Sequence, residues 1–188
     1  DIELYDIYVD DGFSGSNFDR PEFKRMISDI EAVCNVVRTF RHIRILQMGP
    51  RPFDFWTTMC NEGELLEKFN IQLSPIPLSE LVAEVRRIEK ANEAQEELQF
   101  LQDNTVIKIA KPKVATVAAL AHAMKNLVDK YGCNAGAIQC WTALQGELGI
   151  MPCAANAILN DMGIPVVCET DIHGAITALL AEAAVMNR

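Results

Sequence analysis

The sequence has no excess of positive charge. Its 17 Lys and Arg residues stand against 26 Asp and Glu residues, which gives a net charge of -9. A protein with this balance has no overall field that attracts phosphates or anionic lipid, so nucleic-acid binding would need a local basic patch. We therefore do not expect DNA as a partner.

Long hydrophobic runs are also missing. The longest apolar stretches, such as residues 114–123, are interrupted and fall short of the roughly 20 residues that a membrane helix needs. The first residues, DIELY, lack the charged and apolar blocks of a secretory signal. These absences predict a soluble, cytoplasmic protein without membrane contact, whose amino terminus is cut from a longer chain.

The six cysteines form no CxxC pair and no framework spacing. A zinc ribbon or a thioredoxin-like motif is therefore not indicated, and reduced thiols that pack as small apolar side chains are expected. Two of the three histidines, His42 and His122, show no partner pattern. We assign no role to either of them.

The pattern of apolar residues and turn residues predicts alternating strands and helices. Hydrophobic residues make up 49% of the chain, enough for one globular core. The expected strands are residues 4–9, 42–48, 71–76, 135–141 and 164–168, and the expected helices include residues 54–69, 79–102, 113–131, 154–162 and 172–186. This order predicts an α/β fold, a doubly wound and mainly parallel sheet with helices on both faces, preceded by a short strand-loop-helix appendage. Ligands of such sheets bind at the carboxyl ends of the strands.

The appendage carries a specific motif. Residues 8–26, YVDDGFSGSNFDRPEFKRM, resemble part of the catalytic domain of serine recombinases of the resolvase and invertase family. The resemblance covers about 31 residues and implies a recombinase-like remnant over residues 1–35, with active-site positions matched by Asp10 and Arg20. The nucleophilic serine of that family would lie upstream of this sequence, so we expect no DNA cleavage. The alternative is that Arg20 only belongs to the start of a helix.

The remaining residues resemble a different family. The stretches GPRPFDF (49–55), NEGELLEKF (61–69) and CETDIHGA (168–175) are similar to the L-fucose isomerase and L-arabinose isomerase superfamily. The resemblance implies that residues 36–188 form the middle α/β domain of that superfamily and that its C-terminal domain is missing. It also implies a sugar substrate, aldose-ketose isomerisation and a divalent metal.

The last of these stretches has chemical sense of its own. If the chain stays extended past Cys168, then Glu169, Asp171 and His173 point to one face, because side chains alternate along a strand. Such an oxygen-rich group suits Mn²⁺ or a related divalent ion. The alternatives are that Asp171 caps the last helix, that Glu169 pairs with a basic neighbour and that His173 lies in the first helical turn.

The resemblance assigns further roles. In the resembling enzymes a metal holds adjacent sugar oxygens while acidic groups move a proton between neighbouring carbons, which makes Glu169 and Asp171 catalytic candidates. A second family carboxylate lies some two dozen residues earlier, where Glu147 is the acidic residue of the stretch 144–156. Arg51 and Trp141 are candidates for substrate binding. An exposed turn is the alternative for Arg51, and core packing is the alternative for Trp141.

The leading interpretation is an incomplete sugar isomerase that is inactive alone and forms a homo-oligomer. A remnant of a DNA recombinase is the second hypothesis. A non-catalytic α/β module for binding or oligomerisation is the third.

Overall fold

The computed structural model describes residues 5–185 and contains one sheet of four parallel strands. The strands lie in the order β2-β1-β3-β4. Their bounds are β1 (Arg44–Met48), β2 (Gln72–Ile76), β3 (Ala135–Ile138) and β4 (Val166–Val167). The helices are α1 (Pro21–Phe40), α2 (Glu62–Phe69), α3 (Leu78–Ala91), α4 (Gln95–Asn104), α5 (Lys111–Lys130), α6 (Gln145–Leu148), α7 (Cys153–Asp161) and α8 (Ile172–Val185), with short turns η1 (Trp56–Thr58) and η2 (Cys140–Leu144). The predicted α/β fold is confirmed.

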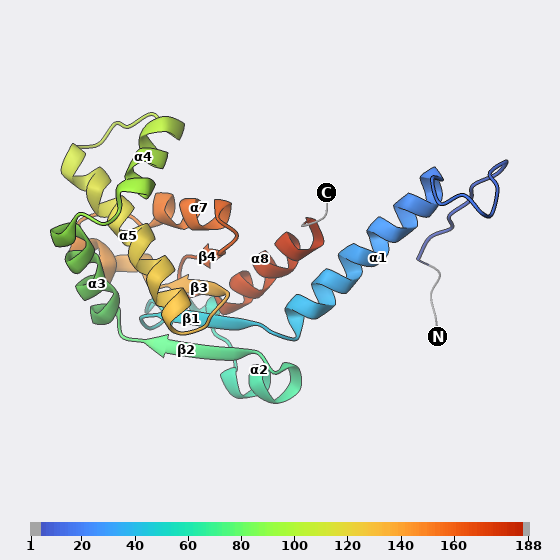
Figure 1. The fold of residues 1–188 in the computed structure, drawn as a ribbon. Helices are drawn as coiled ribbons and strands as arrows, with labels where there is room; N and C mark the ends of the chain where they lie inside the picture. Colours follow the sequence, from blue (N-terminus) through green and yellow to red (C-terminus); the bar gives the residue numbers. More distant parts are fainter. Residues whose placement is uncertain (1–4, 186–188) are drawn as a thin grey trace.

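Helices cover both faces of the sheet (Figure 1). Leu46 and Met48 of β1 pack into the core formed with α3, α5 and α7, whereas Ile45 packs into the second core with α2 and α8. Neighbouring residues of β3 divide in the same way, with Ala137 on the second face and Ile138 on the first. This alternation is the period of two that a strand imposes, and it explains why both faces of the sheet are apolar.

The helical segment between β2 and β3 is interrupted. The sequence predicts one helix over residues 79–102, but α3 ends at Ala91 and α4 begins at Gln95. Asn92 adopts a left-handed φ of 56° and closes α3. Asparagine tolerates this conformation better than most residues, so it serves as a helix end.

The amino-terminal segment lies against α1 and not against the sheet. The predicted strand over residues 4–9 is wrong for residues 5–9, which form no strand, and Leu4 lies outside the described residues. Tyr8 donates a hydrogen bond to Asp29 of α1 at 2.8 Å, and the Arg25 guanidinium lies 4.3 Å from the centre of the Tyr8 ring. These contacts hold the segment to the helix, so it neither joins nor covers the main sheet.

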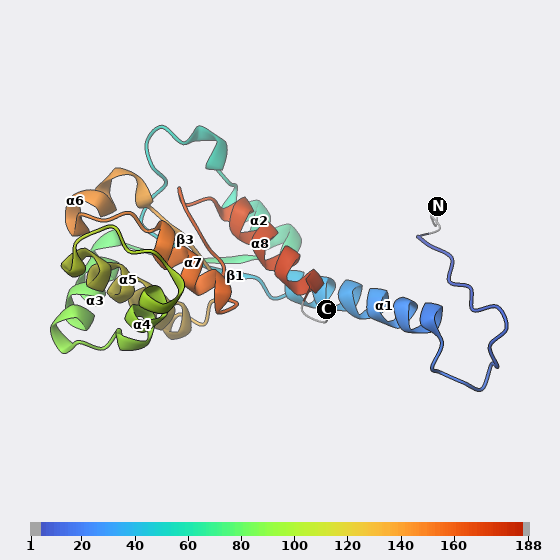
Figure 2. The same ribbon diagram turned by 90° about the horizontal axis from the view of Figure 1, so that it is seen from above.

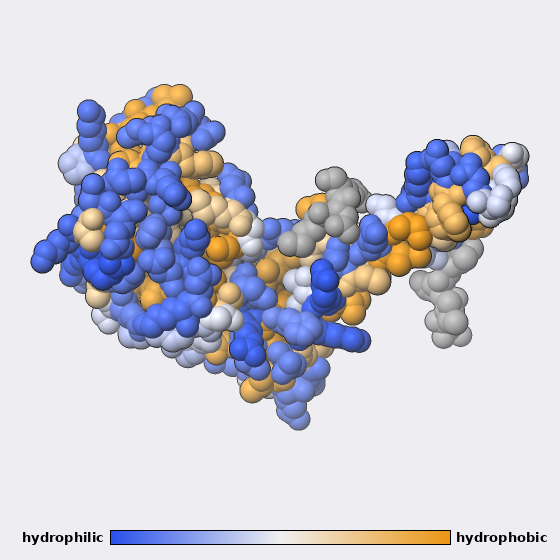
Figure 3. Space-filling view, in the orientation of Figure 1, coloured by the Kyte–Doolittle hydropathy of each residue, from blue (hydrophilic) through white to orange (hydrophobic). Residues whose placement is uncertain are grey.

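Helix α1 extends away from the sheet and packs beside α8 (Figures 1 and 2). None of its residues is buried, and its apolar residues include the exposed Ile30 and Val33. Hydrophobic surface is visible along this helix in Figure 3. The predicted domain boundary at residue 35 falls inside this continuous helix.

No helix in the described part of the chain is both long enough and apolar enough to cross a membrane.

Candidate functional site

The sheet has a switch point between β1 and β3. After β1 the chain runs to β2 on one side, and after β3 it runs to β4 on the other. Ligands of parallel α/β sheets bind in the crevice outside the carboxyl ends at such a point. Gly49 follows β1 with φ of 86°, and Gln139 follows β3 and donates its backbone N–H to the Met48 carbonyl at 2.9 Å. These positions define the candidate site.

The loop after β4 turns sharply into this edge. Glu169 and Thr170 adopt left-handed φ values of 55° and 54°. The Thr170 N–H donates to the Ile138 carbonyl at 3.1 Å, and the Asp171 N–H donates to the Cys168 carbonyl at 3.1 Å. The chain therefore does not stay extended past Cys168, because this turn connects β4 directly to the start of α8.

Asp171 and His173 lie at the amino end of α8. The Asp171 carboxylate accepts a hydrogen bond from the Gly174 N–H at 3.0 Å, which is the geometry of a helix cap. His173 is exposed in the first turn of the helix. Glu169, Asp171 and His173 therefore do not point to one face in this structure. The roles of Glu169 and Asp171 as catalytic residues, and of all three as metal ligands, stay predictions.

Glu169 instead faces two cysteines. The Cys140 thiol donates to Glu169 Oε1 at 3.4 Å, and the Glu169 N–H donates to Cys140 Sγ at 3.4 Å. Cys168 joins them, so that one ligand atom from each of the three residues lies within 4.8 Å of the others. Within residues 5–185 this is the one set of three His, Cys, Asp or Glu side chains that converges in this way.

Both thiols of this group are protonated near neutral pH. Burial raises the pKa of the Cys140 thiol above its ordinary value. Burial and the nearby Cys140 and Glu169 raise the pKa of Cys168 to about 12. Neutral thiols and one carboxylate therefore line this part of the crevice.

The group does not fit the metal that the resemblance implies. Mn²⁺ prefers oxygen ligands, whereas two of the three converging atoms are sulfur. The spacing of the cysteines along the chain does not reveal this group, because Cys140 and Cys168 form no metal-binding motif in the sequence. A usable signal was present, since Cys168 directly follows β4 and Cys140 comes two residues after β3.

Arg51 lies just after β1, beside a cavity of about 230 Å³ that Thr58 and Thr170 also line. Its Nη1 donates to the carbonyls of Pro52 at 3.0 Å and Phe53 at 3.2 Å. Its guanidinium also lies 4.9 Å from the centre of the Trp56 ring. Both of these hydrogen bonds use Nη1, so Nε and Nη2 keep donors for a ligand.

The other two predicted site residues lie on the segment after β3. Trp141 is 49% exposed in η2, so it is not part of the core. Glu147 is exposed on α6, and its carboxylate pairs with Arg86 of α3 at 3.0 Å. This pair lines a separate cavity of about 330 Å³. The structure therefore does not bring Glu147 into the group around Glu169.

The two positions that resemble recombinase residues stabilise the start of α1. The Asp10 carboxylate accepts hydrogen bonds from the N–H groups of Glu22 and Phe23, both at 2.9 Å. The Arg20 guanidinium lies 5.0 Å from the centre of the Phe23 ring. Arg20 thus belongs to the start of α1, which is the alternative to a recombinase role given for it above.

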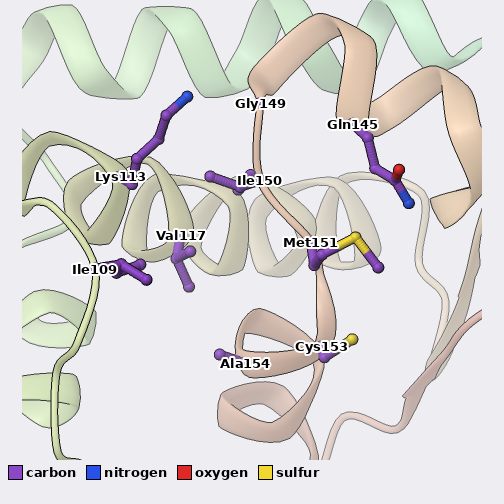
Figure 4. A pocket seen from close by; sticks show the side chains of 9 residues that line it. All are labelled: Ile109, Lys113, Val117, Gln145, Gly149, Ile150, Met151, Cys153 and Ala154. Atoms are coloured by element: carbon purple, nitrogen blue, oxygen red, sulfur yellow. The ribbon is translucent and has the colours of Figure 1, made fainter.

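A larger cavity of about 610 Å³ lies between α5, α6 and α7, and none of the predicted site residues lines it (Figure 4). Its lining is mostly apolar and includes Val117, Ile150 and Met151. Lys113 donates to the Leu148 carbonyl at 3.3 Å. The charged group of this lining is therefore held by the backbone, and the cavity lacks the convergent polar groups of a site that orients its ligand.

Comparisons with known proteins identify distant relatives. No family model matches the chain. The chain is 22% identical over 168 residues to a sulfoquinovose isomerase from Alkalicoccus urumqiensis, a match that covers 89% of the chain and 38% of that relative. It is 25% identical over 165 residues to one from Priestia megaterium, covering 84% and 35%, and 27% identical over 168 residues to one from Clostridium sp. (strain MSTE9), covering 85% and 37%.

These comparisons support a relationship to sugar isomerases at low identity. The chain spans a little over a third of the length of these relatives, between 35% and 38%. The comparisons do not support the recombinase resemblance of the opening residues.

Proposed function

We propose that the chain forms the sheet domain of a sugar isomerase and contributes Glu169 to a site at the carboxyl ends of β1, β3 and β4. The observation that carries this proposal is the position of Glu169. A tight turn holds this carboxylate at the switch-point edge, in a chain whose relatives are named sulfoquinovose isomerase. Because the chain spans only 35% to 38% of those relatives, the proposal gives it part of a site and not the whole activity.

The proposed reaction is the interconversion of an aldose and a ketose. Glu169 takes the proton from C2 of the open-chain aldose, which leaves an enediolate. The hydroxyl proton then moves from O2 to O1, and Glu169 returns its proton to C1 to form the ketose. Asp171 acts as a positioning residue, because its cap on α8 fixes the loop that carries Glu169. In the resembling enzymes a divalent metal supplies Lewis-acid chemistry, but the atoms that converge here do not fit Mn²⁺, so no step is assigned to it.

Arg51 is the proposed contact for an anionic part of the substrate. Sulfoquinovose carries a sulfonate, and a guanidinium binds such a group through two parallel hydrogen bonds. Thr58 and Thr170 line the same small cavity, but their hydroxyl groups donate to backbone carbonyls, so the Arg51 guanidinium is the donor proposed for the anion. We therefore propose a sulfonated or otherwise anionic sugar as the substrate class.

A chimera tests the proposal. This chain replaces the matching segment of the Priestia megaterium relative, and conversion of sulfoquinovose to its ketose is followed by NMR. We expect turnover in the chimera and a loss of at least about 100-fold in kcat for Glu169→Gln, the scale of a lost general base. Arg51→Met should raise KM more than it lowers kcat.

The control is Glu67→Gln, which changes an exposed carboxylate on α2 and should leave turnover unchanged. A folded but inactive chimera would contradict the proposal. Full activity of the Glu169→Gln chimera would contradict the assignment of this residue.

A further inference from the structure

We propose that Cys140, Cys168 and Glu169 bind a thiophilic divalent cation of the Zn²⁺ type. This site shares Glu169 with the proposed isomerase site, so a bound cation would occupy the carboxylate that acts there as the base. Its binding can nevertheless be measured without turnover, because all three ligands belong to the described chain. Cys140 follows β3 and the other two residues follow β4, so adjacent parallel strands place all three at one edge.

The spacing of the ligand atoms matches a tetrahedral site. In such a site the Zn–S bond is about 2.3 Å and the Zn–O bond is about 2.1 Å, which puts sulfur and oxygen about 3.6 Å apart. Cys140 Sγ and Glu169 Oε1 are 3.4 Å apart. The ligand atom of Cys168 lies within 4.8 Å of both. A cation can therefore enter with little movement of the chain.

The backbone holds Glu169 in this position. Its N–H donates to Cys140 Sγ, and its carbonyl accepts from the Thr58 hydroxyl at 3.3 Å. The next residue is tied to β3 through the hydrogen bond between the Thr170 N–H and the Ile138 carbonyl. Contacts to three separate elements, η1, η2 and β3, thus fix the loop before any cation binds. Such preorganisation favours binding, because less conformational freedom is lost.

A fourth group points to a ligand. Asn156 of α7 is only 5% exposed, and its Nδ2 donates to Cys168 Sγ at 3.3 Å. Its Oδ1 is buried and has no hydrogen-bond partner among the described residues. A buried acceptor without a partner costs about 1–3 kcal/mol. Rotation of the amide would aim this oxygen at a cation held by Cys168 and complete four ligands.

The chemistry of the ligands selects the cation. Two sulfurs and one or two oxygens favour Zn²⁺ or Cd²⁺ over Mn²⁺ and Mg²⁺. Only the thiolate form of cysteine ligates, so Cys140 and Cys168 each lose one proton when the cation binds. One divalent cation therefore enters and two protons leave to the buffer.

The test uses the intact, reduced chain and Cd²⁺ or Zn²⁺ alone. Ultraviolet absorption reports Cd²⁺–thiolate bonds, and calorimetry in buffers of different ionisation enthalpy counts the released protons. We expect one equivalent bound, about two protons released and Mn²⁺ bound at least about 100-fold more weakly. No thiolate absorption with Cd²⁺, or tighter binding of Mn²⁺, would overturn the proposal.

Variants separate this site from the other cysteines. The double change Cys140→Ser and Cys168→Ser should abolish the absorption, whereas Cys34→Ser on exposed α1 should leave it unchanged. A complementary variant keeps only the proposed pair and replaces the other four cysteines: C34S, C60S, C133S and C153S. Retained binding in that variant supports the site even if the double variant does not fold, and lost binding overturns it. These readouts do not involve turnover, so failure of the isomerase proposal leaves this test unaffected.

Discussion

Substitution of Gly49 by alanine should destabilise the fold strongly. Gly49 is buried at the carboxyl end of β1 and has a left-handed φ of 86°. A Cβ atom there would lie 2.9 Å from Gln139 Cβ and 2.7 Å from Gln139 Oε1. The left-handed backbone costs a residue with a Cβ about 1–2 kcal/mol, and overpacking adds about 1–3 kcal/mol. The expected loss is therefore about 2–5 kcal/mol.

A second glycine provides the matched control. Gly63 lies in the first turn of α2, and a Cβ there would meet only Asn61 Oδ1 at 3.5 Å, an ordinary contact. Both substitutions reduce the freedom of the unfolded chain in the same way, so the difference between them reports the folded state. Gly63→Ala should be neutral or stabilising by up to about 1 kcal/mol.

Urea denaturation followed by circular dichroism measures this difference. With a slope of about 2 kcal/mol per molar urea, Gly49→Ala should lower the midpoint by about 1–2.5 M. A Gly49→Ala protein whose free energy of unfolding lies within about 0.5 kcal/mol of the parent would refute the reasoning.

Three further predictions concern other contacts. Asp10→Ala removes the acceptor of two N–H groups at the start of α1; amide exchange in the first turn should accelerate, at a cost of about 1 kcal/mol, and unchanged exchange would contradict the capping role. His122→Leu removes the 2.9 Å contact between His122 Nδ1 and Glu97. Because Glu97 is only 3% exposed, its buried side chain is left without this partner, and the free energy of unfolding should fall by about 3 kcal/mol. The double variant His122→Leu, Glu97→Leu should recover most of that loss. Equal free energies of unfolding for the parent, the single variant and the double variant would contradict a stabilising contact between these two residues. The hydrogen bond from Lys130 holds the pKa of Glu80 below its usual value. The stability from this contact is therefore complete above the unfolded-state pKa and lost as pH falls through the folded-state pKa. Urea titrations at several pH values should show that the free energy of unfolding falls less steeply at acid pH in Glu80→Gln than in the parent, by less than about 1 kcal/mol. The same acid dependence in both proteins would contradict this contribution of Glu80.

The sheet was predictable because strand periodicity and core burial act together. Ile45, Leu46 and Met48 are all apolar, as expected for a strand covered on both faces, and the structure places β1 at the predicted position. The end of α3 was not predicted, because charged residues continue with helical spacing through Asn92 and only the left-handed backbone there marks the break.

The candidate site was predictable in position but not in composition. Strand order places the residues after β4 at the switch-point edge, and Glu169 lies there. Which side chains face one another depends on the dihedral angles of two loop residues, and alternation along a strand carries no information about them. Cys140 approaches Glu169 from a segment 29 residues away, so no local spacing reveals the contact.

The strand order also affects how the chain folds. The two central strands are distant in sequence, since the Arg44 N–H bonds to the Asn134 side chain 90 residues later. β1 and β2, by contrast, pair Arg44 with Gln72, a separation of 28 residues. Closing the longer loop costs about 1 kcal/mol more in chain entropy, because that cost grows with the logarithm of loop length. The centre of the sheet, and with it the crevice that holds Glu169, therefore has a higher entropic barrier to assembly than the β1–β2 edge.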